Sequence, residues 1–214
     1  MTSSDLERVD RAYRRLGRRW AWNALAFAGF QGWESTIRRR AVTRLELQPG
    51  ATVLDVACGR GSNFPYLQRV IGDGGRVVGV DYSATMLAGA QALAKERQWA
   101  NVGLVRADAS QMHFKTQFDG AICTIAMSVI PRWRESIRAM VEAVRPGGRV
   151  AVVDGRLGTG LRRFGNPYAR FFASITAAEL GRDIPGECRA LLVDAHEESV
   201  FIGTYYIVSG RVPS

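Results

Sequence analysis

Hydrophobic residues follow two alternating patterns along most of this chain. From Ala51 onward, short apolar runs bounded by glycine turns alternate with stretches in which apolar residues recur every three or four positions. Strands that are apolar on both faces and alternate with helices are typical of a parallel sheet covered on both sides. The predicted strands are residues 52–57, 77–80, 102–105, 121–125 and 150–153. The predicted helices between them are residues 64–71, 84–97 and 133–144.

A different pattern precedes these elements. Its apolar residues form one helical stripe with arginines on the other faces, namely Leu6, Val9, Tyr13, Leu16 and Trp20. This spacing predicts helical structure within residues 4–46, which the run Gln48-Pro49-Gly50 closes. We therefore expect residues 1–48 to form an N-terminal helical cap or lid and residues 49–214 to form the main domain.

The pattern becomes less regular after the fifth predicted strand. Residues 155–183 contain glycines, arginines and aromatic residues without a clean period. Residues 185–194 could form a helix, and residues 199–202 and 204–208 resemble two short strands. We expect those two strands to pair antiparallel at one edge of the sheet, within a single α/β domain.

Composition places the chain among ordinary globular proteins. Of its 214 residues, 47% are apolar and 23% are charged, which excludes wholesale disorder. The three cysteines, Cys58, Cys123 and Cys188, include no CxxC pair, as is typical of reduced thiols in the cytosol. Neither a secretory leader nor an apolar stretch long enough to span a bilayer is present. The sequence thus predicts a soluble cytoplasmic protein.

The positive charge is concentrated near the N-terminus. Residues 1–44 contain ten arginines and four acidic residues, so they carry +6 of the net charge of +9. A basic segment predicts an anionic partner, either a nucleic acid or a membrane surface. The simplest function for the N-terminal helix is to cover the site. The additional hypothesis is that the arginines and aromatic residues of 4–30 rest peripherally on the inner face of an anionic membrane.

A glycine-rich loop follows the first predicted strand and leads into a helix. It reads Cys58-Gly59-Arg60-Gly61-Ser62-Asn63, and such a turn lets a ligand approach bare backbone at a helix N-terminus. Asp81 ends the second strand, where a carboxylate can accept both hydrogen bonds of a ribose diol. These two features predict nucleoside binding at the carboxyl edge of the sheet.

Three acidic residues favour a cationic nucleoside over a pyrophosphate cofactor. Phe64 occupies the place where a dinucleotide fingerprint needs a third glycine. Asp55, at the end of the first strand, would repel a pyrophosphate but attract an ammonium or sulfonium group. Asp108, after the third strand, can accept from an adenine amino group. A cationic amino-acid nucleoside fits all three acids, whereas a pyrophosphate cofactor fits only one.

The segment 53–154 resembles the class I S-adenosylmethionine-dependent methyltransferases. It contains, in order, the glycine-rich loop, the acidic second strand end, the acidic third loop and the Arg145-Pro146-Gly147-Gly148 turn, which we expect to end the third helix. The resemblance implies a Rossmann-like fold with a mostly parallel seven-stranded sheet, helices on both faces and an N-terminal helical cap. It also implies S-adenosyl-L-methionine as cofactor and S-adenosyl-L-homocysteine as product.

The resemblance further implies the contacts of the cofactor. The loop backbone and Asp55 would hold the methionine part, Asp81 the ribose, and Asp108 with Ala109 the adenine amino edge. Tyr82 and Met86 would pack on the adenine and Thr124 would lie near the sulfonium, although the first two also suit the core and the third suits a capping role. The expected cofactor-binding residues are Asp55, Ala57, Gly59, Arg60, Gly61, Asn63, Asp81, Tyr82, Met86, Asp108, Ala109 and Thr124.

The segment 124–133 resembles the small bacterial phosphatidylethanolamine and betaine-lipid N-methyltransferases. Those enzymes also have a basic, tyrosine-bearing N-terminal helix, which implies a catalytic role for Tyr13. The function expected from this resemblance is N-methylation of an amine on a small or lipid acceptor, although Arg132 stands where those enzymes favour an acid. The quinone-ring methyltransferases share most of these features. The alternative is therefore C- or O-methylation of a quinone or other aromatic molecule.

An aromatic acceptor would favour a pocket walled by aromatic side chains, with the candidates being Phe164, Tyr168, Phe171 and Phe172. An RNA acceptor is disfavoured, because Thr124-Ile125-Ala126-Met127 stands where many base methylators carry Asn/Asp-Pro-Pro-aromatic. No cluster of His, Cys, Asp and Glu has metal-ligand spacing, so we predict no metal. A regulatory protein without turnover has little support, since every cofactor motif is intact.

Overall fold

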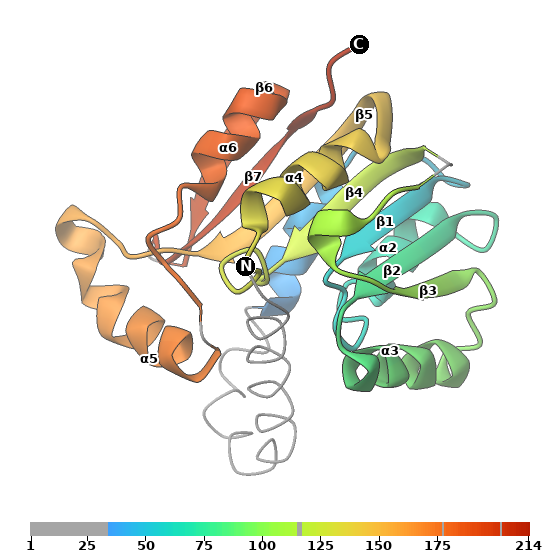
Figure 1. The fold of residues 1–214 in the computed structure, drawn as a ribbon, viewed down its shortest axis with the longest axis horizontal. Coiled ribbons are helices and arrows are strands. Elements are labelled where there is room, and N and C mark those ends of the chain that lie inside the picture. The colour runs from blue at the N-terminus through green and yellow to red at the C-terminus, as the bar shows by residue number, and fades with distance from the viewer. Residues whose placement is uncertain (1–33, 115–116, 177, 202) are drawn as a thin grey trace.

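The computed structural model describes residues 34–114, 117–176, 178–201 and 203–214. These residues form one seven-stranded sheet in the order β3-β2-β1-β4-β5-β7-β6. Strands β1 to β5 run parallel to one another, whereas β7 runs antiparallel to both β5 and β6. Helices lie on both faces of the sheet (Figure 1). The predicted Rossmann-like, mostly parallel fold is therefore confirmed.

The elements have the following bounds. The strands are β1 Thr52–Val56, β2 Arg76–Asp81, β3 Val102–Arg106, β4 Phe118–Thr124, β5 Val144–Gly155, β6 Val193–Val200 and β7 Tyr205–Arg211. The helices are α2 Phe64–Ile71, α3 Ala84–Glu96, α4 Trp133–Glu142, α5 Asn166–Thr176 and α6 Ile184–Leu191, with the 3-10 turns η1 Ala109–Gln111 and η2 Gly160–Gly165. Residues 34–43 are also helical.

Two boundaries differ from the prediction for the same reason. Helix α4 ends at Glu142, and β5 already begins at Val144, which lies opposite Phe118 of β4 in the parallel ladder. The Arg145-Pro146-Gly147-Gly148 run therefore stays in the strand, held by backbone hydrogen bonds between 147–148 and Val212 of 3.0 and 2.8 Å. The run therefore does not end the helix itself, but the predicted tight turn is present as a bulge in β5: the register passes from the pair Phe118 and Val144 directly to the pair Gly120 and Arg149, and Gly147 has φ 76°. Pairing with distant strands, which local sequence does not reveal, extends β5.

The C-terminal region confirms the predicted antiparallel edge and adds one helix. Strand β6 begins at Val193, which pairs with Arg211 of β7, so the predicted helix 185–194 stops earlier, at the end of α6. Helix α5 was not predicted, because its region showed no clean apolar period. It stands away from the sheet (Figure 1).

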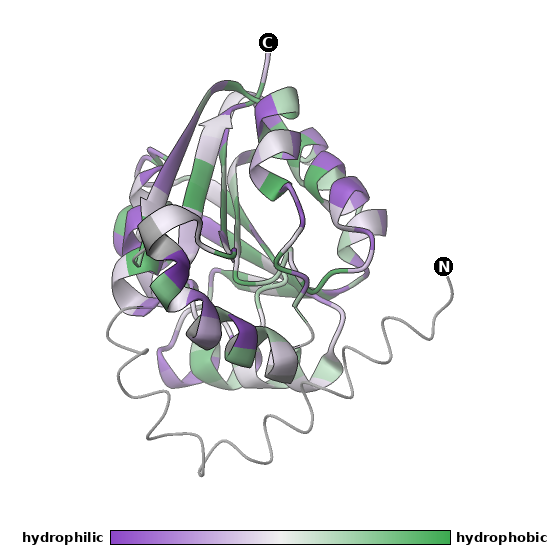
Figure 2. Cartoon of the chain, turned by 90° about the vertical axis from the view of Figure 1, so that its left-hand side faces the viewer, coloured by the Kyte–Doolittle hydropathy of each residue, from purple (hydrophilic) through white to green (hydrophobic). Residues whose placement is uncertain are grey.

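The core consists of two apolar layers, one on each face of the sheet. Helices α4 and α6 cover one face, where they pack on residues such as Leu54 and Val56 of β1. Residues 34–43 and helix α2 cover the other face, on which Val53 lies. Side chains alternate along a strand, so Asp55 shares the face of Val53. The helices present mixed hydrophilic and hydrophobic residues around this core (Figure 2).

The N-terminal cap falls largely outside the described residues. Residues 1–33, with the predicted stripe and Tyr13, lie outside that part of the chain. Within it, Ile37, Ala41 and Val42 pack into the same core as α2. The division at residue 48 therefore stays a prediction. No helix in the described ranges is long and apolar enough to span a bilayer.

Candidate active site

The candidate site lies where β1, β2 and β4 end and the glycine-rich loop turns into α2. Three residues of this loop have left-handed backbone angles: Ala57 with φ 52°, Gly59 with φ 55° and Gly61 with φ 82°. A Cβ on Gly61 would lie 2.6 Å from the Phe64 ring. Glycine at 61 therefore lets that ring fold beneath the loop, so the bulky residue that argues against a dinucleotide site instead supports the loop from below.

Asp81 connects this loop to the start of α3. Its Oδ2 accepts a hydrogen bond from the backbone N–H of Gly59, and its Oδ1 accepts one from that of Ser83, both at 2.8 Å. The carboxylate predicted to bind the ligand thus also shapes the loop.

Asp55 is fully buried at the end of β1. Its Oδ1 accepts a hydrogen bond of 2.8 Å from Asn63 Nδ2, while its Oδ2 has no hydrogen-bond partner among the described residues. Burial raises the pKa of Asp55 to about 7, against the opposing effects of Asn63 and Arg38. An unsatisfied buried carboxyl oxygen is costly, so this atom fits a site that receives a hydrogen-bond donor from a ligand.

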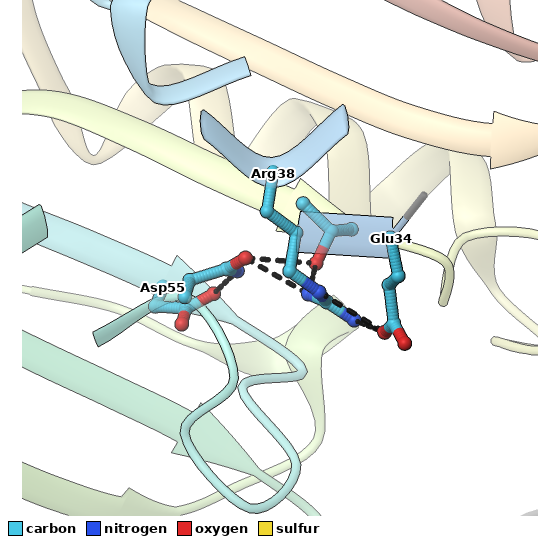
Figure 3. A network of polar contacts seen from close by, with 5 residues as sticks. Glu34, Arg38 and Asp55 are labelled. Carbon is cyan, nitrogen blue, oxygen red and sulfur yellow. Dashed lines mark hydrogen bonds and ion pairs between the residues drawn. The ribbon is translucent and has the colours of Figure 1, made fainter. Parts of the chain in front are cut away.

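Figure 3 shows Glu34, Arg38 and Asp55 in a polar network that sequence analysis only partly identified. Asn63 joins Arg38 to Asp55 in this network. Its Oδ1 accepts hydrogen bonds from Arg38 Nη1 at 2.8 Å and from Thr124 Oγ1 at 3.1 Å. Arg38 also contacts the Thr124 hydroxyl and pairs with Glu34 one helical turn earlier. The structure thus brings the predicted residues Asp55, Asn63 and Thr124 together. Arg38 and Glu34 were missed, although their i, i+4 spacing was visible.

The residues expected around the adenine lie at the ends of β2 and β3. Asp108 Oδ1 accepts from the backbone N–H and the hydroxyl of Ser110 at 2.9 and 2.8 Å, which places buried Ala109 at the start of η1. The half-buried ring of Tyr82 lies 5.9 Å from the Arg106 guanidinium.

Two further expected residues lie along α3. Met86 is half-buried on this helix. A Cβ added to Gly89 would come within 3.1 Å of Arg60 Cγ, so the exposed Arg60 side chain packs along the helix. Its contribution to a ligand site would therefore be that of its backbone.

A second buried carboxylate supports the segment after β4, which belongs to the stretch 124–133 whose resemblance bears on the acceptor. Asp154 accepts hydrogen bonds from the backbone N–H and the hydroxyl of Ser128, each at 2.7 Å. Burial raises the pKa of Asp154, and the bonds from Ser128 oppose that rise. Arg182 donates to the carbonyl oxygens of Met127, at 2.8 Å, and Ile130. Two residues that sequence analysis had not singled out therefore bind residues 127–130, which we call the acceptor segment.

The proposed aromatic wall is not formed by the described side chains. Phe164 is 86% exposed and Phe171 is 55% exposed, because η2 and α5 stand away from the sheet. The side chains of Tyr168 and Phe172, like Tyr13, lie outside what the structure describes. Among the described residues, no group of three or more His, Cys, Asp or Glu side chains is placed to hold a metal ion.

Comparison with known proteins adds a family to this geometry. Residues 53–148 match the family described as "Methyltransferase domain". The chain is 31% identical over 132 residues to a demethylmenaquinone methyltransferase of Desulfitobacterium hafniense, covering 61% of this chain and 51% of that protein. It is 30% identical over 165 residues to the protein of the same name from Geobacillus sp., covering 70% of each. The chain thus spans between about half and 70% of these relatives' lengths.

A solved structure shows the same fold. Phosphoethanolamine N-methyltransferase 2 of Haemonchus contortus, in complex with phosphomonomethylethanolamine and S-adenosylhomocysteine, aligns with a TM-score of 0.69 at 16% identity. The alignment covers 84% of this chain and 53% of that one. At this identity the match supports the fold alone.

Proposed function

Because this chain belongs to the class I S-adenosylmethionine-dependent methyltransferases, we propose that it methylates a ring carbon of a quinone or a related aromatic molecule. The observation that carries this proposal is the 30% identity over 70% of both chains to a demethylmenaquinone methyltransferase. That relative supports the alternative considered above better than N-methylation of a lipid amine.

The residues of the site fit the family's cofactor. When bound, S-adenosylmethionine supplies a methyl group activated by its sulfonium. The unsatisfied Asp55 Oδ2 suits the cofactor's ammonium, and Asp81 ends β2, where a carboxylate can accept from the ribose hydroxyls. Asp108 with Ala109 would contact the adenine amino edge. The full proposed set remains Asp55, Ala57, Gly59, Arg60, Gly61, Asn63, Asp81, Tyr82, Met86, Asp108, Ala109 and Thr124.

Toward the acceptor, the main role of this chain would be to position the reacting atom, and acid–base chemistry would contribute less. Methyl transfer chiefly requires the acceptor atom to lie about 3 Å from the methyl carbon in a water-poor pocket. Asp154 and Arg182 hold the segment that follows β4. This support favours a fixed acceptor pose. Residues 1–48 are the proposed cap, and their Tyr13 would close the site over the acceptor.

A lipid surface is a proposed partner as well, since prenylated quinones are membrane-soluble. In addition to residues 4–30, a second surface supports this proposal. We call it the η2–α5 surface and define it by four exposed residues, namely Arg163, Phe164, Arg170 and Phe171. Residues 155–178 contain four arginines and no acidic residue. Basic residues beside exposed aromatic rings suit an anionic membrane interface.

N-methylation of an amine, on a small molecule or a lipid headgroup, stays the second candidate because of the resemblance of residues 124–133. One experiment separates the two. The protein is incubated with methyl-labelled S-adenosylmethionine and either a reduced 2-prenyl-1,4-naphthoquinone or phosphatidylethanolamine vesicles. We expect label on a ring carbon of the naphthoquinone. Label recovered on the lipid amine alone would contradict quinone methylation and support the second candidate.

A further inference from the structure

The helix over residues 34–43 places a buried arginine beside the glycine-rich loop (Figure 3). Arg38 is 9% exposed and donates from Nη1 to Asn63 Oδ1 at 2.8 Å and from Nε to Glu34 Oε1 at 3.0 Å. Arginine is rarely buried unless it is paired. Ile37, Ala41 and Val42 already hold this helix on the sheet through apolar contacts. Packing of the helix therefore does not require a charge at position 38.

The contacts of Arg38 determine how the Asn63 side chain is oriented. Arg38 has only donors to offer, so the Asn63 amide must turn its oxygen toward the guanidinium. Its Nδ2 then points at Asp55 Oδ1, to which it donates at 2.8 Å. A flipped amide would set its NH2 against the guanidinium and its oxygen against the carboxylate. Arg38 thus fixes an amide that could otherwise adopt two orientations.

We propose that Arg38 is a positioning residue of the cofactor site, which fixes the Asn63 amide and so holds Asp55 as the carboxylate that receives the cofactor's ammonium. This inference rests on the proposed function, because it takes Asp55 as a cofactor-binding residue. It adds a role for the helix over residues 34–43, whose Arg38 acts on the cofactor site through Asn63. The Oδ2 atom of Asp55, which has no hydrogen-bond partner among the described residues, is the atom left to meet the ammonium.

The charges around Asp55 support this role. The neighbouring carboxylate of Asp81 raises the pKa of Asp55, whereas the Arg38 guanidinium lowers it. Burial and the charge of Asp55 raise the pKa of the Cys58 thiol. Burial likewise raises the pKa of the Cys123 thiol. Both thiols are therefore neutral near pH 7.

Loss of Arg38 should therefore raise the pKa of Asp55 further. Below that pKa the carboxyl group is neutral and cannot pair with an ammonium, and above it the carboxylate can. Cofactor affinity should rise with pH through this midpoint, and an Arg38→Met variant should show a higher midpoint. Each unit of displacement corresponds to roughly a tenfold loss of affinity at a pH below both midpoints.

The test measures the dissociation constant of S-adenosylhomocysteine by calorimetry between pH 5.5 and 7.5. An α-amino group, with a pKa of about 7.7–8.0, stays mostly charged in this range. The variants are Arg38→Met, Arg38→Lys, Asp55→Asn and the double variant Arg38→Met/Asp55→Asn. For a midpoint displaced upward by about one unit, we expect Arg38→Met to bind roughly tenfold more weakly at pH 5.5, which lies below both midpoints. Arg38→Lys, which keeps the charge, should retain the wild-type midpoint.

The Asp55→Asn variant and the double variant should both bind S-adenosylhomocysteine weakly and with equal affinity. Their affinity should not depend on pH. If Asp55→Asn binds like the wild type, the cofactor role of Asp55 fails, and with it the proposed function's placement of the ligand. If Asp55→Asn is weak but Arg38→Met loses the same factor at every pH, Arg38 is merely structural and the inference is overturned. Should Arg38→Met fail to fold, an upward displacement of the midpoint in Arg38→Lys would overturn it instead.

Discussion

The Asp81 carboxylate accepts a hydrogen bond from the backbone N–H of Gly59 at 2.8 Å, across the ends of two adjacent strands. The same carboxylate reaches Ser83 at the start of α3. One side chain therefore organises the glycine-rich loop and is proposed to bind the ribose. The carboxylate holds the loop as well as facing the expected ribose, so its removal should affect binding in two ways.

Asp81→Ala should weaken S-adenosylmethionine binding by about 2 kcal/mol or more, roughly thirtyfold. The variant leaves two ribose hydroxyls and the Gly59 N–H without their acceptor. Calorimetry measures the change, and Asp73→Ala, which removes one acidic charge from an exposed loop, is the matched control. Equal affinity of the two variants would overturn the assignment of Asp81 to the ribose.

Asp55→Asn should stabilise the ligand-free protein at pH 8 while weakening cofactor binding. Burial raises the pKa of Asp55 from 3.8 to about 7. A carboxyl group whose pKa is raised on folding favours the folded state fully below pH 3.8 and loses that contribution as pH rises through about 7. At about 1.36 kcal/mol per unit, ionised Asp55 destabilises the fold by up to about 4 kcal/mol. Asparagine removes this cost.

The measurement is urea unfolding of both proteins at pH 5 and pH 8. The gain of stability in Asp55→Asn should be larger at pH 8. Asp119→Asn is a control of opposite sign. Partial burial works against ionisation of Asp119, but hydrogen bonds from the Thr52 N–H and Arg145 outweigh it and lower its pKa. A destabilised Asp55→Asn at pH 8 would show that this carboxylate holds the fold instead of the ligand.

Sequence analysis located the acids of the site because topology does most of that work. In a parallel sheet the carboxyl ends of adjacent strands meet at one edge, so Asp55 and Asp81 had to lie near each other once the strands were recognised. Helix α2 was predicted with its observed bounds, because Pro65 opens its first turn and glycines follow its end. Local signals and strand order thus fix these parts of the molecule.

Arg38 and Asp154 could not be found in this way. Arg38 is one of ten arginines in residues 1–44, and only its packing against Asn63, 25 positions away, distinguishes it. Asp154 meets Ser128 across 26 positions. The start of β5 depends likewise on pairing with β4. Such features arise from tertiary contacts, which the periodicity of hydrophobic residues along the chain does not reveal.

Ser128→Ala should lower methyl transfer without weakening cofactor binding. The Ser128 hydroxyl donates to buried Asp154 at 2.7 Å and so holds the acceptor segment. Leaving one partner of a buried hydrogen bond unsatisfied costs about 1–3 kcal/mol, so we expect roughly a tenfold fall in kcat/KM for the reduced naphthoquinone. Ser174→Ala, on the exposed side of α5, is the control. A parallel loss of cofactor affinity would show that the segment serves the cofactor instead of the acceptor.

The last prediction concerns the η2–α5 surface and the basic N-terminal segment as a joint membrane contact. Vesicles containing phosphatidylglycerol should sediment the protein at low salt, whereas phosphatidylcholine vesicles should not. Each arginine near such a surface contributes about 1 kcal/mol, and salt screens that attraction, so moderate salt should release the protein.

The double variant Phe164→Ser/Phe171→Ser should bind the vesicles more weakly and turn over membrane-embedded quinone more slowly, yet keep its rate on a water-soluble short-chain quinone. Val105→Ser, which removes an exposed apolar residue from β3, is the matched control. Deleting residues 1–30 then shows which of the two surfaces binds the membrane. If vesicle binding persists in the deletion variant but is lost in Phe164→Ser/Phe171→Ser, the η2–α5 surface makes the membrane contact. Should the intact protein ignore anionic vesicles at low salt, the membrane proposal fails and the enzyme must take its acceptor from water.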